Sequence, residues 1–225
     1  VSLTSGFAAN DEGLGWGDAN SAARVLSLGI SAFTNDKKWK TNLNATHLAE
    51  RDGLLGSRMT GAFGNDVRAG TKSLTLSSDW QFGKDFMFSA SYTVAQSETI
   101  RRDARILEVN NRLNSNAMAF GLSKKGVFDD EDQMYVSISQ PLRLSNGQAR
   151  LTYDDHYDED MNLVSNSVDI DLRPTGREVD VQLGYAKSLN DGGKMKLLFY
   201  HANDYRHVAG SDDTGVLARF EWSFD

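Results

Sequence analysis

Hydrophobic and polar residues alternate along most of this chain with a period of two. In residues 85–95 and 178–186, every second side chain is apolar and most of those between are polar or small. The closing run repeats the pattern, with apolar positions at Val216, Ala218, Phe220, Trp222 and Phe224. Successive side chains of a β-strand point to opposite faces, so this period indicates strands with one apolar and one polar face. The sequence therefore predicts an all-β protein.

Turn-forming residues separate the alternating runs. Asn, Asp, Gly and Pro gather at 35–37, 51–53, 145–147, 174–176 and 190–193. Between such signals we expect twelve strands, at about 22–33, 38–49, 55–64, 71–82, 85–97, 113–124, 132–144, 148–157, 163–173, 177–188, 193–203 and 214–224. Residues 99–110 are the one helical candidate, and they lie between two strands.

Two all-β architectures fit this alternation. In a soluble sandwich or lipocalin-like barrel the apolar face would be the core. In a transmembrane barrel the apolar face would meet lipid and the polar face would line the lumen. Strand length favours the membrane, since about 9–11 tilted residues cross a bilayer. So do an even strand count and the aromatic residues near strand ends, at Trp39, Trp80, Phe82 and Tyr92. We expect a closed, up-and-down antiparallel transmembrane β-barrel of about 12 strands.

Loop lengths predict how such a barrel is oriented. With both termini in the periplasm, the long connections 98–112 and 204–213 face outward, as in bacterial barrels. The connection 158–162 fits less well. It is short and would lie on the periplasmic side, although the acidic run DDHYDED at 154–160 leads into it.

Composition narrows the function classes. The 225 residues carry a net charge of −7, which argues against a nucleic-acid partner. Cysteine is absent, so disulfides and thiolate metal sites are excluded. No apolar stretch is long enough to cross a bilayer as a helix. The first residues lack the basic and apolar regions of a signal peptide, so we expect the chain to be a mature or excised part of a longer protein.

Charged residues on the predicted polar faces are candidates for a lumen wall. Neighbouring strands carry opposite charges in several places, which supports pairing across a wet lumen. An ion-selective path is the sharper alternative. The candidate lumen-lining residues are Arg150, Asp154, Asp169, Asp171, Glu178, Asp180, Lys194, Lys196, Arg219 and Glu221.

Catalytic and metal-binding patterns are weak. No G-x-S-x-G elbow is present. The acidic runs at 129–132 and 154–160 lack the glycine and distal glutamate of an EF-hand. We therefore expect no enzyme activity, no cofactor and no metal. If the chain were an enzyme, His207 with Asp204 or Asp212 would be the place to look.

Four segments carry specific motifs: LLGSRMTGAFG at 54–64, the block at 119–151, LRPTGREVDVQLGYAKSL at 172–189 and the end at 200–224. They resemble segments in the C-terminal barrels of subtilisin-like serine peptidase autotransporters. They occur in the family's order and at similar spacing. The resemblance implies a translocator and membrane anchor for an N-terminal peptidase in a Gram-negative outer membrane. No segment resembles the peptidase's serine motif, so no catalytic residue carries over.

The same resemblance implies domain bounds and partners. Residues 1–21 correspond to a linker entering the barrel, and residues 22–225 to the outer-membrane β-barrel. The expected partners are outer-membrane lipid, the barrel insertion machinery and the passenger. The closing strand fits the C-terminal assembly signal, although Asp225 follows the last aromatic; its residues are Gly215, Val216, Ala218, Phe220, Trp222 and Phe224. A soluble binding module or a small outer-membrane pore are the alternatives.

Overall fold

The protein is all-β in the computed structural model. The structure describes residues 2–9, 22–34, 36, 38–51, 53–54, 57–58, 67–101, 107–109, 112–189 and 193–222. Within these ranges there is no α-helix, and the one helical element is a 3-10 turn, η3 (Tyr205–His207). In the described part of the chain, no helix is long and apolar enough to cross a membrane.

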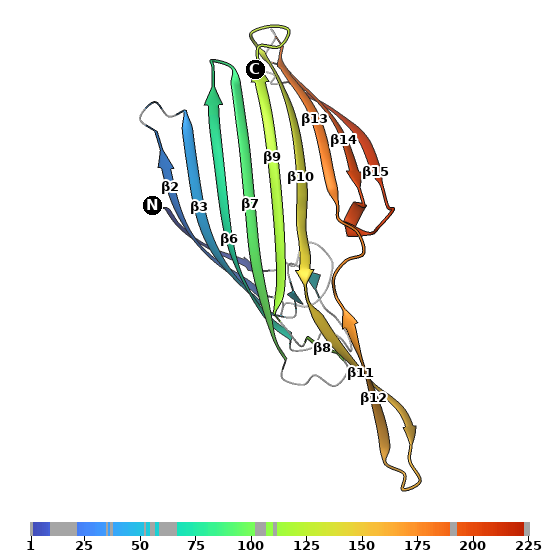
Figure 1. Cartoon of the computed structure of the whole chain (residues 1–225). Coiled ribbons are helices and arrows are strands. Elements are labelled where there is room, and N and C mark those ends of the chain that lie inside the picture. Colours follow the sequence, from blue (N-terminus) through green and yellow to red (C-terminus); the bar gives the residue numbers. More distant parts are fainter. Residues whose placement is uncertain are drawn as a thin grey trace.

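Most strands belong to one large antiparallel sheet. Its ten members are β1 (Ser2–Ala9), β2 (Ala22–Phe33), β3 (Trp39–Arg51), β6 (Val67–Phe82), β7 (Phe86–Arg101), β9 (Leu113–Lys125), β10 (Asp132–Asn146), β13 (Val179–Ser188), β14 (Lys194–Asn203) and β15 (Asp213–Glu221). These strands lie side by side in chain order, with β1 and β15 at the two edges (Figure 1). Each neighbouring pair is antiparallel, so the sheet is an up-and-down meander.

Two smaller sheets lie outside this meander. β11 (Gln148–Tyr157) and β12 (Leu163–Asp171) form a long hairpin, and β8 (Leu107–Val109) pairs with β11. Figure 1 shows the hairpin projecting beyond the end of the large sheet. β4 (Gly53–Leu54) and β5 (Ser57–Arg58) form a two-residue ladder in the connection between β3 and β6.

Three predicted strands are therefore wrong as members of the large sheet. β3 pairs directly with β6, so no strand at 55–64 separates them, and residues 59–64 lie outside the described ranges. The predicted strands 148–157 and 163–173 form the projecting hairpin, because β10 pairs directly with β13. Among the described residues the large sheet has ten strands instead of the twelve expected, and the ten include β1.

The mistaken turn at 145–147 has a physical explanation. Gly147 is not in the left-handed conformation that the expected turn would use, and the chain runs on from β10 into β11. A Cβ on Gly147 would overlap the side chain of Leu113, so this glycine permits close packing between strands. The reversal comes instead after Tyr157, where the carboxylate of Asp158 accepts hydrogen bonds from the backbone of the next few residues. Such Asx turns are a recurring way to reverse a chain.

β1 falls in the segment that the resemblance assigns to a linker. It pairs antiparallel with β2 from Ser2 opposite Gly29 to Ala9 opposite Ala22. This part of the segment therefore extends the sheet as an edge strand. Residues 10–21 lie outside the described ranges, and whether the segment enters a barrel stays a prediction.

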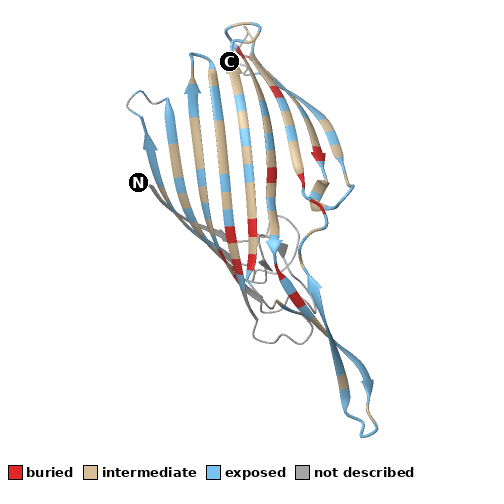
Figure 2. Cartoon of the chain, viewed as in Figure 1, coloured by how far each residue is buried: buried red, intermediate tan, exposed pale blue. Residues whose placement is uncertain are grey.

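The apolar face of the sheet is more exposed than its polar face, which is the reverse of a soluble protein. Along β2, Leu26, Leu28 and Ile30 are about half exposed, whereas Ser27 and Gly29 between them are more enclosed. Figure 2 shows the same mixture of exposed and intermediate positions along most strands, with few buried ones. A curved sheet encloses the residues on its concave side, so the polar face is the inner face and the apolar face is the outer one.

Register partners extend the apolar face into continuous rows. Residues directly opposite each other in an antiparallel pair lie on the same face. One outer row crosses eight strands through Trp39, Trp80, Phe88, Leu122, Val136, Leu183, Phe199 and Val216. By contrast, the buried apolar residues among those described are Ala69, Ala95, Leu113, Ala149 and Ala202. The described fold therefore has an extensive outer apolar surface and almost no inner apolar core.

The two ends of the sheet carry different connections. At one end lie the short turns 34–38, 83–85, 126–131 and 189–193. At the other end lie the long connections 52–66, 102–112, 147–178 and 204–212. The hairpin belongs to the connection 147–178, so its acidic tip lies at the long-loop end. This corrects the expected position of 158–162 and removes the misfit that it caused.

Excision of the projecting hairpin should leave the large sheet intact. The Leu172 amide donates to the Gly147 carbonyl at 3.1 Å, so the base of the hairpin is already closed. We expect a variant with residues 148–171 replaced by two glycines to fold and to keep the strand content of its other strands, as measured by circular dichroism in detergent. In a twelve-stranded sheet the same deletion would remove two wall strands, so failure to fold would contradict the arrangement described.

Candidate functional site

The inner face is built mainly from small polar side chains that bond across strands. Ser27 Oγ donates to Asn44 Oδ1 at 2.7 Å, and the hydroxyls of Thr75 and Thr93 lie 2.8 Å apart. A further hydroxyl pair, Thr71 and Ser97, is buried at the long-loop end with 2.7 Å between oxygens. These residues leave room along the inner face and offer hydrogen bonds to water or to a polar chain. They support a wet interior better than a packed one.

The structure divides the ten predicted lumen residues into two groups. Four of them, Arg150, Asp154, Asp169 and Asp171, lie on the hairpin strands β11 and β12, away from the large sheet. The remaining six lie on or beside the last three strands of the large sheet: Glu178, Asp180, Lys194, Lys196, Arg219 and Glu221. Register supports one predicted charge pair directly, because Arg150 lies opposite Asp169 with 2.9 Å between Nε and Oδ1.

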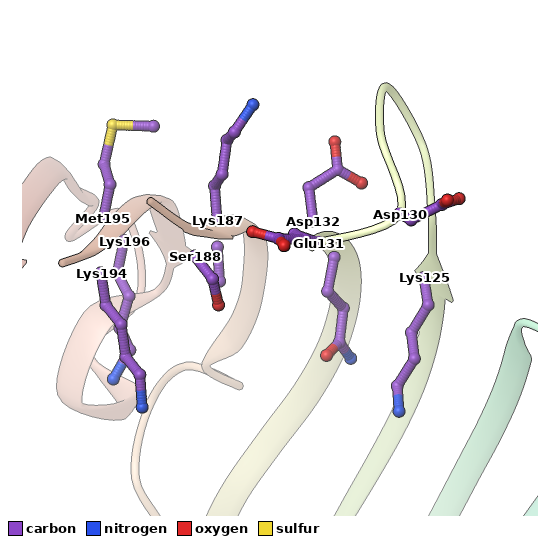
Figure 3. A pocket seen from close by; sticks show the side chains of 11 residues that line it. Lys125, Asp130, Glu131, Asp132, Lys187, Ser188, Lys194, Met195 and Lys196 are labelled. Atoms are coloured by element: carbon purple, nitrogen blue, oxygen red, sulfur yellow. The ribbon is translucent and has the colours of Figure 1, made fainter. Parts of the chain in front are cut away.

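At the short-turn end the inner face is rich in cations. Lys196 lies directly opposite Arg219, and Lys194 lies opposite Glu221. The Glu221 carboxylate forms an ion pair with each of two cations: its Oε1 is 2.8 Å from Arg219 Nε and 3.5 Å from Lys196 Nζ. In Figure 3 the side chains of Lys125, Lys194 and Lys196 point to one side of the sheet, whereas those of Lys187 and Met195 point to the other. This alternation places the first three on the inner face.

At the long-loop end, His207 holds the loop to the sheet. Its Nδ1 accepts a hydrogen bond from the Glu178 amide at 3.0 Å, and its Nε2 donates to the Leu142 carbonyl at 3.1 Å. Because a carbonyl oxygen only accepts, these partners assign the donor role to Nε2 and the acceptor role to Nδ1. Both nitrogens are thus engaged with backbone groups, which is a structural arrangement and leaves no free nitrogen for a general base.

The two aspartates named beside His207 have structural partners as well. The Asp204 carboxylate accepts from the amides of Gly210 at 2.8 Å and Arg177 at 3.1 Å, and these two bonds hold the pKa of Asp204 below its ordinary value. Asp212 Oδ1 accepts from the Asp204 amide at 3.3 Å. The three residues gather in one loop, but their hydrogen bonds shape the loop.

Two glycines on the inner face lie beneath tyrosine rings. A Cβ on Gly184 would overlap the ring of Tyr135, its register partner on β10. A Cβ on Gly215 would overlap the ring of Tyr200 in the same way. Each ring therefore fills the place of the missing side chain on the neighbouring strand, and such aromatic cover stabilises glycine in sheets. Sequence reasoning named Gly215 only as the start of an assembly signal and missed both pairings, because they depend on register.

Aromatic residues gather on the outer face at the short-turn end. Trp39 lies opposite Trp80, and the rings of Trp80 and Phe82 are 5.2 Å apart. Tyr92 lies farther along, opposite Leu76, in the middle of the apolar band. In the closing strand, Val216, Ala218 and Phe220 share the outer face, and the Phe220 and Trp222 rings stack at 6.0 Å. Phe224 lies outside the described residues.

The tip of the hairpin should lose its turn in acid. The backbone amide of Asn162 donates to Asp158 and is the largest cause of the lowered pKa of that carboxyl group. Because the pKa of Asp158 is lowered on folding, its ionised carboxylate stabilises the turn fully at pH values above 3.8, the ordinary pKa of this group. This contribution is lost as the pH falls through the folded-state pKa. We expect the Asn162 amide to lose protection against hydrogen exchange in this acidic range, and NMR measures that loss. Replacing Asp158 with alanine should abolish the pH dependence; an unchanged dependence would refute its origin in Asp158.

Comparison with known proteins gives no family assignment. No protein-family model matches the sequence, and no curated protein or solved structure matches the chain. The resemblance to autotransporter translocator barrels therefore stays a prediction. Within the ranges described, no group of three or more histidine, cysteine or acidic residues is placed to hold a metal ion.

Proposed function

We propose that the chain forms a closed ten-stranded β-barrel in a bacterial outer membrane and serves there as a translocator and anchor. Closure requires β1 to pair with β15, the two edges of the sheet. The sheet has an even number of antiparallel strands, so these edges run in opposite directions and are suited to antiparallel pairing. Closing the ladder would satisfy the backbone groups of both edges, which a bilayer requires.

The observation that carries the proposal is the exposed apolar outer face. Large apolar side chains on consecutive strands are exposed, including Leu28 at 46%, Leu76 at 51% and Phe120 at 47%. A soluble protein rarely exposes a continuous apolar surface of this extent, because burying it would be strongly favourable. Lipid would cover the outer face, while the inner hydroxyl and amide groups would contact water.

The distribution of connections supports an orientation. Bacterial barrels keep short turns in the periplasm and long loops outside. By this rule the turns 34–38 and 83–85 lie in the periplasm, and the projecting hairpin of β11 and β12 lies outside the cell. The aromatic cluster at Trp39, Trp80 and Phe82 would then mark the periplasmic interface, where such rings are favoured.

The translocator role rests on the sequence resemblance together with the polar inner face. Small side chains such as Ser27, Thr75 and Ser91 leave space along the inner face, and Ser27 and Thr75 already bond to neighbouring polar groups. An extended polar chain could pass such a wall without meeting an apolar barrier. The passenger implied by the resemblance is a secreted peptidase attached N-terminal to the barrel.

Surface delivery of a reporter tests the translocator role. The chain would be expressed in a Gram-negative host with a signal peptide and a protease-sensitive, epitope-tagged segment before residue 1. We expect protease added to intact cells to remove the epitope, whereas a control lacking residues 22–222 should leave it protected. An epitope that stays protected beside a correctly inserted barrel would refute the translocator role and leave only the anchor.

A further inference from the structure

One part of the inner face breaks the polar pattern. Many inner positions carry Ser, Thr, Asn or Gly, but Leu198 and Leu217 lie opposite each other on β14 and β15. Their row continues through Gly184 to Tyr135, whose ring covers that glycine. Two leucines and a tyrosine thus form an apolar patch on the inner face; another apolar pair of that face, Val25 and Leu48, lies on β2 and β3, toward the opposite edge of the sheet. Apolar groups facing a wet interior cost free energy unless something covers them.

The next row toward the short-turn end carries excess positive charge. Lys196 and Arg219 are direct register partners, and like charges in that position destabilise a strand pair. The carboxylate of Glu221 forms ion pairs with both of them and is shared between the two. Lys194 and Lys125 lie on the same face, as Figure 3 shows. Among the described residues this inner edge therefore has more cations than nearby carboxylates to neutralise them.

The apolar and cationic rows share one cavity. Its volume is about 430 Å³, within the range of roughly 300–1,000 Å³ typical of small-molecule sites. The inner-face residues that line it are Gln133, Tyr135, Ala186, Lys196, Leu198, Leu217 and Arg219. A second cavity beside it continues toward the turns, and its lining combines Lys125, Lys194 and Lys196 with the acidic residues Asp130, Glu131 and Asp132. The apolar patch of Leu198 and Leu217 is therefore directly beside the charged row of Lys196 and Arg219.

We propose that this cavity binds a small anionic amphiphile, with a carboxylate or phosphate head between Lys196 and Arg219 and an alkyl chain over Leu198 and Leu217. The head would relieve the repulsion between the two cations, and the chain would cover the apolar patch. Gln133 is placed to donate a further hydrogen bond to the head. The inference rests on the proposed function in one respect, namely that the inner face becomes a lumen.

Equilibrium dialysis with decanoate and with decyl phosphate tests the proposal on the full chain, folded in detergent. We expect saturable binding of at least one of them, and the comparison shows whether a carboxylate or a phosphate head is preferred. Lys196→Gln with Arg219→Gln should weaken it by about tenfold or more, because a charged hydrogen bond is lost at each position. Leu198→Ser with Leu217→Ser should weaken it similarly. A matched control, Lys72→Gln with Lys84→Gln, removes the same charge elsewhere and should leave binding unchanged.

Further measurements show how much the head group and the alkyl chain each contribute to binding. They also test the binding site separately from the closed barrel. Decanol and inorganic phosphate each carry half of the recognition, so each should bind at least about tenfold more weakly than the better amphiphile. Equal binding by the wild type and both site variants, for both amphiphiles, would overturn the proposal. Heat-dependent electrophoretic mobility, measured on the same samples, reports the closed barrel independently. A closed barrel without site-dependent binding refutes only the amphiphile site.

Discussion

Replacing Leu76 with arginine is expected to lower the free energy of unfolding in a bilayer by about 2–4 kcal/mol, the cost of a cation at the lipid-facing midplane of a barrel. Leu76 lies near the middle of β6 on the outer face, between its partners Leu43 and Tyr92. It is 51% exposed, so in the proposed barrel its neighbour is lipid. Denaturant titration in lipid vesicles, followed by tryptophan fluorescence, measures the change.

Leu76→Trp distinguishes lipid from a packed core at the same position. A core would resist the larger ring and lose about 1–3 kcal/mol, because overpacking forces strain on the neighbours. Lipid accommodates the ring, so we expect Leu76→Trp to be nearly neutral. Ser77→Arg, one residue away on the inner face, is the matched control and should also cost little. A large loss in Leu76→Trp would favour the soluble sandwich, in which this face is the core.

Replacing Gly184 with alanine should cost about 1–3 kcal/mol, because the added methyl group overlaps the ring of Tyr135 and forces the strands or the ring to shift. Gly70→Ala is the matched control, since a Cβ there lies 3.7 Å from the nearest atom of His47, an ordinary contact. The same unfolding titration compares the two variants.

A double variant shows whether the Gly184 effect arises from the ring. Combining Gly184→Ala with Tyr135→Ala should cost less than the sum of the single changes, because the overlap no longer exists. Strict additivity would mean that the two residues do not contact each other in the folded protein. Similar losses for Gly184→Ala and Gly70→Ala would also contradict the ring-over-glycine arrangement.

Alternation along the sequence was sufficient to predict most strands of the large sheet, but it missed β1 and β8 and could not give the strands their partners. Residues such as Phe86, Phe88 and Val216 determine which side chains share a face, because a strand has period two. Which strand lies beside which depends on where the chain reverses. Gly147 was interpreted as a turn because glycine often occupies one, yet here it allows Leu113 to pack closely. The same residue type serves both purposes, so the sequence alone could not separate them.

The candidate site was predictable to a similar extent. The pattern placed Lys194, Lys196, Arg219 and Glu221 on the polar face, and register agrees with that placement. It could not show that Lys196 stands opposite Arg219, because a shift of register would change every partner. Nor could it show that Arg150 and Asp169 belong to a projecting hairpin, since their alternation is the same as that of a wall strand.

Electrophoretic mobility in SDS, compared before and after boiling, tests the closed barrel most directly. The comparison is made on protein extracted with detergent and on protein extracted without it. A closed barrel resists SDS until heated, so its unboiled and boiled forms should migrate differently, and it should require detergent to stay dispersed. We expect both results for the proposed barrel. A protein that stays monodisperse in plain buffer and migrates identically in both samples would contradict it, and the exposed apolar face would then require a different cover.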